Sequence, residues 1–265
     1  MSVILISIDG LRPDALLRAG CCHLLRFRDR GAYTMCASSV IPSLTLPCHT
    51  SIFHSVPPTR HGITTNSWQP MAHPLPGLIK VAHQHGKHCA FFYSWEQLRD
   101  LSQPGQLEYT YFANNGENNG RPNFHVDGLI AAEAGCYIIT REPDFAFIYL
   151  GTLDIAGHTF GWMSNGYLAQ LNRIDDLFGD LLEALPDDCT ILVQGDHGGH
   201  GREHGTDMLE DITIPWMITG PNIRANYEIQ APVTLLETAP TLARLLNIPP
   251  VAQWYGRCLD EIFIR

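Results

Sequence analysis

One aspartate and three histidines lie within nine residues of the second half of the chain: Asp196, His197, His200 and His204. They follow the apolar run 189–193, which predicts a buried strand. A hydrophobic core gains nothing from burying four polar side chains, whereas carboxylate and neutral imidazole groups are favoured ligands of divalent cations. The cluster therefore predicts a metal site at the end of a strand.

Two further carboxylates occupy the same kind of position. Asp9 follows the apolar run 3–8, and Asp154 follows the run 145–150, with His158 four residues later. In a helical turn, residues four apart share one face and can bind the same ion. An Asp-x-x-x-His pair occurs often by chance. Together with the other strand-end carboxylates, however, it indicates a metal-dependent enzyme.

Alternating strands and helices are predicted to position these side chains. The predicted strands are the apolar runs 3–8, 145–150, 190–193 and 215–218, each suited to burial on both faces of a parallel sheet. The predicted helices are the amphipathic segments 167–185 and 234–246, and 82–93 predicts a helix followed by a strand. This alternation predicts an α/β fold, a three-layer α/β/α sandwich around a mostly parallel central sheet. Ligands collect at the carboxyl ends of such strands, where Asp9, Asp154 and Asp196 are expected.

The length of the chain favours one domain. A chain of 265 residues can bury a large core, and we expect a single catalytic domain over 1–265. The region 67–135 is richer in turn residues and includes the polar run 114–123, which predicts a surface loop. We therefore expect a small cap or lid insertion at about 94–127.

Composition narrows the class of protein. Hydrophobic residues make up 45% of the chain, and the formal net charge is −10 with no run of basic residues. An acidic protein is poorly suited to a polyanion, so a nucleic-acid polymer is not expected as a partner. The first apolar run is too short for a signal segment or a membrane span, so we expect a cytoplasmic protein without a membrane partner. The eight cysteines include no CxxC pair and are expected to be reduced. The oligomeric state is left open.

Thr45 begins a second informative segment, in which Pro47 stands where the first turn of a helix would be. Thr45 is therefore expected to be the N-cap of that helix. From this segment alone, the favoured role of its hydroxyl is to satisfy a backbone N–H group. The alternative is that a hydroxyl near a cation acts as a nucleophile, while the helix end stabilises a phosphoryl anion.

Together, these residues resemble the alkaline phosphatase superfamily and, within it, a short form of the type I phosphodiesterase/nucleotide pyrophosphatase family. The matching segments follow the family's order: Asp9-Gly10, Thr45-Leu46-Pro47-Cys48-His49, His61-Gly62-Ile63 leading to Asn66, Asp154 with His158, Asp196-His197-Gly198, and His204. The segments 237–241 and 255–257 also resemble the end of this superfamily's domain. The match spans nearly the whole chain, and the ordered combination is specific.

The resemblance implies a site with two divalent metal ions. One ion would be held by Asp9, Asp196, His197 and the Thr45 oxygen, and the other by Asp154, His158 and His204. Zinc is the first expectation for such ligands, and manganese fits similar ones. Thr45 would attack the phosphorus in line and form a phosphothreonine intermediate, which is then hydrolysed. Asn66 would donate a hydrogen bond to a non-bridging phosphoryl oxygen.

Some residues keep two interpretations. His204 lies only seven residues after His197, whereas larger relatives place their last metal-binding histidine far downstream, so His200 is a rival for this role. Trp68 either stacks on a base or another aryl group of the substrate, or buries its ring against the sheet. His49 and His61 are expected to brace the loops of the site rather than to bind metal.

The function implied is hydrolysis of a small phosphorylated substrate, either a phosphodiester or a nucleotide pyrophosphate. A phosphomonoesterase or a phosphonate-bond hydrolase of the phosphonoacetate type is the alternative, because the metal core is common to all of them. A sulfatase is disfavoured, since the chain lacks a Cys-x-Pro-x-Arg type segment. An inactive metal-binding relative is the alternative from another class. Thr45 and Asn66 argue against it, because a purely structural metal needs neither.

Overall fold

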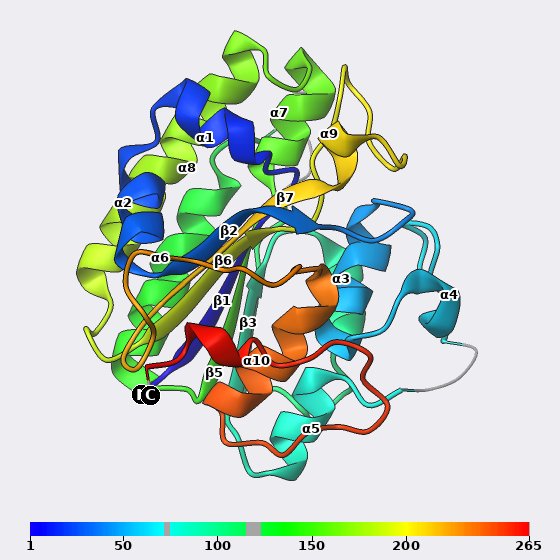
Figure 1. The fold of residues 1–265 in the computed structure, drawn as a ribbon, viewed down its shortest axis with the longest axis vertical. Helices are drawn as coiled ribbons and strands as arrows, with labels where there is room; N and C mark the ends of the chain where they lie inside the picture. Colours follow the sequence, from blue (N-terminus) through cyan, green and yellow to red (C-terminus); the bar gives the residue numbers. More distant parts are fainter. Residues whose placement is uncertain (72–74, 115–122, 265) are drawn as a thin grey trace.

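The computed structural model describes residues 1–71, 75–114 and 123–264, and within them eight strands form one central sheet (Figure 1). Their order is β4-β3-β5-β1-β6-β7-β2-β8. The strands are β1 (Val3–Ile8), β2 (Ala32–Ser38), β3 (Cys89–Tyr93), β4 (Tyr109–Phe112), β5 (Phe145–Leu150), β6 (Thr190–Gly195), β7 (Thr213–Thr219) and β8 (Tyr227–Glu228). The three predicted strands that precede Asp9, Asp154 and Asp196 are therefore neighbours in the middle of the sheet.

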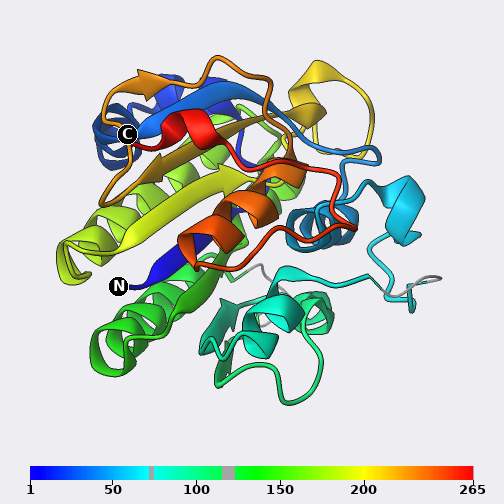
Figure 2. The ribbon, with the colours of Figure 1, turned by 60° about the horizontal axis from the view of Figure 1, so that its bottom comes forward.

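Helices cover both faces of this sheet (Figures 1 and 2). One face carries α1 (Pro13–Ala19), α2 (Cys22–Arg30), α6 (Val126–Arg141), α7 (Thr152–Phe160) and α8 (Asn165–Ala184). The other carries α3 (Thr45–His54), α5 (Leu78–Gln84) and α10 (Thr238–Leu245). Successive side chains of a strand point to opposite faces, so Ile4, Ile6 and Ile8 of β1 pack in the first layer and Val3 and Leu5 in the second. The predicted three-layer sandwich is confirmed.

The remaining helices are short and lie in the connections. They are α4 (Pro58–His61), α9 (Leu209–Ile212) and the 3-10 helices η1 (Glu96–Leu101), η2 (Leu235–Glu237) and η3 (Asp260–Ile262). The predicted helix 234–246 is divided between η2 and α10. The side chain of Thr234 accepts a hydrogen bond of 3.1 Å from the backbone N–H of Leu236. The backbone N–H of Thr234 donates a hydrogen bond of 2.7 Å to the Glu237 carboxylate. This reciprocal cap begins the segment with a tighter turn before α10.

One predicted strand has the opposite direction to that expected. β4, β3, β5, β1 and β6 are parallel, but β7, which contains the predicted strand 215–218, runs antiparallel to both β6 and β2. A parallel pair needs a crossover that carries the chain back along the sheet, usually by a helix of several turns. Between β6 and β7 the chain forms loops and the four-residue helix α9, so it re-enters the sheet from the end at which it left. Burial on both faces does not reveal this direction.

The cap expected at about 94–127 stays a prediction. Among its described residues, η1 lies beside α3, and β4 pairs in parallel with β3 and extends the sheet. Most of the polar run at 114–123 lies outside the described residues. Across the described ranges, no helix is both long and apolar enough to cross a membrane.

Candidate active site

The ends of three adjacent strands bring the predicted metal ligands together. In the register of the sheet, Ile8 of β1 pairs with Leu150 of β5 on one side and with Gly195 of β6 on the other. Asp9 and Asp196 are each the next residue along the chain, and the backbone N–H of Gly10 donates to Asp196 Oδ1 at 3.1 Å. The sequence predicted this meeting point from the position of each aspartate after a buried strand, because carboxyl ends of parallel strands share one edge.

Helix α7, which follows β5, supplies one ligand group. Asp154 and His158 lie one turn apart, with 3.5 Å between Asp154 Oδ2 and His158 Nε2. His204, from the loop after β6, places its Nε2 atom 3.5 Å from Asp154 Oδ1. One ligand atom from each of these three residues lies within 4.8 Å of the others, which is close enough to hold one ion. This is the second of the two ligand sets expected from the resemblance.

The other ligand group adjoins the first. His197 Nε2 lies 3.1 Å from Asp9 Oδ1 and 3.5 Å from Asp196 Oδ2. Ligand atoms of Asp9, Asp154 and His197 also lie within 4.8 Å of one another, so Asp154 is within reach of both groups. Possible ligand residues are therefore gathered in two adjoining groups.

Each histidine of the site has one ring nitrogen held and the other turned inward. The Nδ1 atoms of His158, His197 and His204 each lie 2.8 Å from a main-chain carbonyl oxygen, that of Arg202, Gly198 and Ser43 respectively. A carbonyl can only accept a hydrogen bond, so each Nδ1 carries the proton. Nε2 is then the atom that faces the centre, which is how proteins orient a metal-binding imidazole.

Among the described residues, the carboxylates of the site form ion pairs with histidines and with no lysine or arginine. Asp9 Oδ1, Asp154 Oδ1 and Asp196 Oδ2 are buried and make no hydrogen bond to any described residue. Burial and then the charge of Asp9 raise the pKa of Asp196 to about 8 and that of Asp154 well above its ordinary value. Burial lowers the pKa of His197, but Asp196 and Asp9 raise it more, to a net value of about 10. Such a cluster is costly unless protons or cations neutralise it, and its oxygen and nitrogen atoms suit divalent cations.

Thr45 is the first residue of α3 and points its hydroxyl at this cluster. Its Oγ1 atom lies 3.2 Å from His197 Nε2, and the residue is 4% exposed. The prediction that Thr45 is the N-cap is wrong by one residue. Leu44, in an extended conformation, is the N-cap, and Thr45 already has helical geometry. The Thr45 hydroxyl is therefore not used for capping and is free for chemistry.

Asn66 performs the capping role that had been assigned to Thr45. Its Oδ1 atom accepts a hydrogen bond of 3.0 Å from the backbone N–H of Leu46 in the first turn of α3. Its amide nitrogen makes no hydrogen bond within the described ranges. Asn66 thus lies beside the nucleophile candidate with a donor available for a ligand.

His200 and His49 have structural partners. His200 Nδ1 lies 2.7 Å from Asp211 Oδ1, in the loop that leads to β7, and His200 belongs to neither ligand group. His49 is fully buried, with Nδ1 2.8 Å from the carbonyl of Thr45 and Nε2 3.0 Å from the Ser7 hydroxyl. His204, by contrast, belongs to a group of residues that could hold a metal ion.

The two consecutive glycines after His197 are needed for close packing. A Cβ atom at Gly198 would lie 2.1 Å from the carbonyl of Glu210, and one at Gly199 would lie 2.3 Å from the Trp162 ring. Larger residues would push apart the turn that carries the site from β6 to His204.

Two residues near the site were missed by sequence reasoning. Tyr149 of β5 donates its hydroxyl to Asp9 Oδ2. Asp127 of α6 is fully buried and accepts hydrogen bonds from the backbone N–H groups of Gly151 and Thr152 at 3.0 and 3.1 Å. Tyr149 is the one hydrogen-bonding side chain in an otherwise apolar strand, which was an available signal. Asp127 lies in a helix with no local pattern to mark it.

Replacing Asp127 with alanine is expected to lower the free energy of unfolding by about 2–3 kcal/mol. The first N–H groups of α7 would lose their acceptor in a buried environment. Urea denaturation of the metal-free protein measures this, and Asp187→Ala, at an exposed position, is the control, expected to change stability by less than about 0.5 kcal/mol. Equal stability of the two variants would show that Asp127 does not hold α7.

Acid is expected to destabilise the protein through His61. Its Nδ1 accepts from Ile63 N at 3.0 Å, so its Nε2 donates to the Ser51 hydroxyl at 3.0 Å, and the ring must be neutral. Burial, followed by the neighbouring His54, lowers the pKa of His61 from 6.5 to about 4. The folded state therefore binds fewer protons than the unfolded state below pH 6.5. Stability is fully present above that pH and falls as pH drops towards about 4, by about 2–3 kcal/mol from this residue.

Denaturation of the metal-free protein between pH 7 and pH 4.5 measures this slope. In His61→Asn, the amide oxygen can accept from Ile63 but does not titrate, so the variant should lose less stability on acidification than the wild type. Parallel pH profiles for the two proteins would contradict the prediction.

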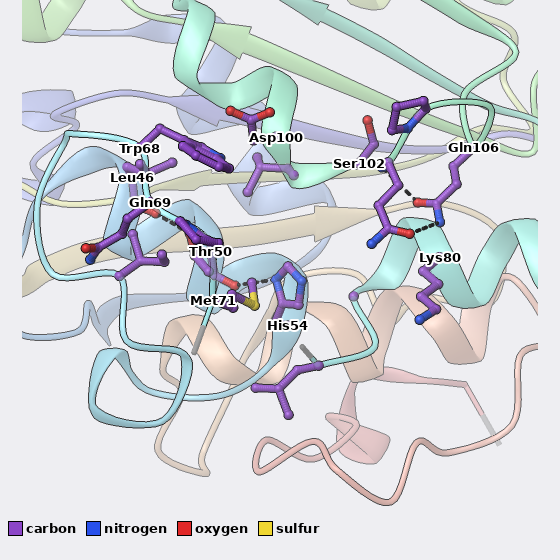
Figure 3. A pocket seen from close by; sticks show the side chains of 17 residues that line it. Leu46, Thr50, His54, Trp68, Gln69, Met71, Lys80, Asp100, Ser102 and Gln106 are labelled. Carbon is purple, nitrogen blue, oxygen red and sulfur yellow. Dashed lines mark hydrogen bonds between the residues drawn. The ribbon is translucent and has the colours of Figure 1, made fainter. Parts of the chain in front are cut away.

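A cavity of about 350 Å³ lies beside α3 (Figure 3). Leu46, the residue after Thr45, lines it together with Thr50 and His54 of the same helix. Trp68, on the loop after Asn66, and Lys80, on α5, come from different sides of the cavity. Trp68 is 57% exposed, so its ring is not buried against the sheet. The cavity is large enough for a small organic group.

The fold of the chain is alkaline phosphatase-like and is shared with solved phosphodiesterase and sulfatase structures. Murine ectonucleotide pyrophosphatase/phosphodiesterase 5, solved as an inactive variant in complex with AMP, matches with a TM-score of 0.83 over 100% of both chains at 14% identity. A 2-O GAG sulfatase matches with a TM-score of 0.80 at 15% identity, over 99% of this chain and 74% of the other. At such identities the likeness concerns the fold alone.

The family follows from the sequence. The model of the type I phosphodiesterase/nucleotide pyrophosphatase family matches residues 3–85 and 80–214, and the chain belongs to this family. An uncharacterised pyrophosphatase/phosphodiesterase of Schizosaccharomyces pombe is 24% identical over 74% of this chain and 44% of its own length. Mouse ectonucleotide pyrophosphatase/phosphodiesterase family member 1 is 26% identical over 83% of this chain and 27% of its own. The chain thus spans less than half the length of these relatives.

Proposed function

We propose that this protein is a metal-dependent hydrolase that cleaves small phosphodiesters or nucleotide pyrophosphates, with Thr45 as the nucleophile. The observation that carries the proposal is the position of the Thr45 hydroxyl. It is buried, unused by the helix that it begins, and 3.2 Å from His197, which lies among the buried carboxylates of Asp9 and Asp196. An inactive metal-binding relative would need neither this hydroxyl nor the free amide of Asn66.

The donor set fits two divalent cations. Asp9, Asp196 and His197, with the Thr45 oxygen, would hold one ion, and Asp154, His158 and His204 would hold the other. Zinc fits these oxygen and nitrogen ligands, and manganese is the alternative. The ions would supply positive charge that lowers the pKa of the Thr45 hydroxyl and neutralises the phosphoryl group.

The side chains of this protein would then perform a displacement in two steps. Thr45 Oγ1 gives up its proton to solvent and attacks the phosphorus, and the bond from phosphorus to the leaving oxygen breaks. The leaving oxygen takes up a proton from solvent, and Thr45 carries the phosphoryl group with its remaining organic substituent. The amide nitrogen of Asn66 donates a hydrogen bond to a non-bridging oxygen, where negative charge accumulates. Water then attacks the same phosphorus and releases Thr45. Because Thr45 is held at the start of α3, its hydroxyl would attack from a fixed position.

The cavity beside Leu46 would bind the organic group that remains on the phosphorus. Its size is in the range of small-molecule sites, and a nucleoside or another aryl-containing group fits a wall formed by Trp68. A phosphomonoesterase or a phosphonate-bond hydrolase could use the same metal ligands. The family to which the chain belongs favours the diester or pyrophosphate.

Hydrolysis of bis-p-nitrophenyl phosphate, p-nitrophenyl phosphate and phosphonoacetate tests the proposal, with Zn²⁺ or Mn²⁺ added and with EDTA. We expect metal-dependent cleavage with the highest kcat/KM for the diester. A preference for the monoester or the phosphonate would move the substrate class to the alternative. If a folded, metal-loaded sample turned over none of these compounds or nucleotide pyrophosphates, the hydrolase assignment would be wrong.

Replacing Trp68 with alanine is expected to raise KM for aryl or nucleoside diesters about ten-fold and to leave kcat nearly unchanged. The ring contacts a part of the substrate that does not react, so it contributes equally to ground-state and transition-state binding. The measurement is KM and kcat of both proteins for a nucleoside diester and for dimethyl phosphate, which has no aromatic group. An equal effect on both substrates would show that Trp68 does not bind the organic group.

A further inference from the structure

Tyr149 holds one oxygen of a predicted metal ligand and leaves the other free. It lies on β5, is 3% exposed, and donates its hydroxyl to Asp9 Oδ2. Asp9 Oδ1 has no hydrogen-bond partner among the described residues and lies 3.1 Å from His197 Nε2. The two oxygens of this carboxylate therefore have different surroundings, and only Oδ1 is presented to the centre of the site.

This mode of support differs from that of the other ligands. Main-chain carbonyls hold the Nδ1 atoms of the three histidines, and the backbone N–H of Gly10 holds Asp196 Oδ1. Asp9 is held instead by a side-chain hydroxyl. Its support can therefore be removed by deleting one oxygen atom, with no change to the backbone.

The Tyr149 ring is itself fixed by close packing. It meets the His49 ring edge-on, with 5.5 Å between ring centroids. A Cβ atom at Gly151 would lie 2.7 Å from the ring, so glycine leaves the space that the ring occupies. His49 in turn hydrogen-bonds to the carbonyl of Thr45. The hydroxyl that holds Asp9 is thus joined through two buried rings to the segment that carries Thr45.

We propose that Tyr149 is a positioning residue that makes Asp9 a ligand through one oxygen and thereby sets the affinity of the metal site formed by Asp9, Asp196 and His197. The inference rests on the metal centre of the proposed function. Without the hydroxyl, the carboxylate could rotate and present either oxygen, or both, to the cation. Loss of such an outer hydrogen bond typically costs 10–100-fold in metal affinity.

The test is a titration of metal-free wild-type protein and of metal-free Tyr149→Phe with Mn²⁺. Electron paramagnetic resonance measures the concentration of free Mn²⁺ at each step. Manganese is the probe because the exposed thiols of Cys22, Cys36 and Cys136 would also bind zinc. In the variant we expect one site to be weakened 10–100-fold and the site of Asp154, His158 and His204 to keep its affinity. Tyr93→Phe is the matched control, since Tyr93 is equally buried on the adjacent strand β3 and packs against Phe112.

A double-mutant cycle separates positioning from a general loss of structure. If Tyr149 acts through Asp9, adding Tyr149→Phe to Asp9→Ala should not weaken Mn²⁺ binding further. A further loss in the double variant, or wild-type affinity at both sites of Tyr149→Phe, would overturn the inference. Wild-type protein that binds two ions but hydrolyses no phosphate ester would refute the proposed function, and the affinity comparison would still decide the role of Tyr149. Wild-type protein that binds no Mn²⁺ would overturn the inference.

Discussion

Thr45→Ala is expected to reduce phosphodiester hydrolysis by at least about a thousand-fold, while the protein still folds and binds two ions. Removal of an attacking nucleophile abolishes the covalent route and leaves only the contribution of binding and charge stabilisation. The buried hydroxyl has no capping role in α3, so its loss should have little effect on stability. A large effect on turnover with a small effect on folding distinguishes a nucleophile from a helix cap.

The measurement is kcat/KM for bis-p-nitrophenyl phosphate at saturating metal, together with urea denaturation. Thr45→Ser is the matched control, because serine keeps the hydroxyl and should retain measurable turnover. Mass spectrometry of wild-type protein quenched with acid during turnover of this diester should detect a p-nitrophenyl phosphoryl group on Thr45. Turnover by Thr45→Ala within ten-fold of the wild type would assign the attack to another group.

The sequence predicts well those site residues that follow a buried strand, because the end of the strand fixes where they lie. β1, β5 and β6 are buried on both faces, and each is followed directly by a polar site segment. This pattern predicts both a sheet and the edge at which Asp9, Asp154 and Asp196 meet. The observed registers of β1 with β5 and β6 agree with it.

The features that sequence reasoning missed depend on contacts between distant segments. Asn66 and Leu46 are 20 residues apart, and Tyr149 and Asp9 are 140 residues apart. No local periodicity encodes such hydrogen bonds. The direction of β7 was missed for a related reason. Its apolar composition reports burial, whereas its direction depends on the path of the loop that contains His204 and α9.

The same loop explains why the sequence left two histidines as rivals. His200 and His204 are four residues apart, and either could follow the strand-end aspartate as a ligand. In the structure, Asp211 holds His200 through a 2.7 Å contact, while the carbonyl of Ser43 orients His204 towards Asp154. The choice is made by partners elsewhere in the chain.

His204→Ala is therefore expected to lose one of two bound ions and at least about a hundred-fold in kcat, whereas His200→Ala keeps both ions. His204 provides an inward-facing Nε2 atom beside Asp154 and His158, and a three-ligand site that loses one ligand binds a cation much more weakly. His200 provides a hydrogen bond to buried Asp211, so its removal should cost about 1–2 kcal/mol of stability instead.

Metal content per chain after dialysis, kcat for the diester and urea denaturation together decide between the two histidines. Each variant is the matched control for the other, since both substitutions remove one imidazole from the same loop. Loss of an ion from His200→Ala with retention by His204→Ala would reverse the assignment. Loss from both variants would mean that the loop, rather than one ligand, determines binding at this site, because Asp211 also accepts hydrogen bonds from Thr206 just beyond His204.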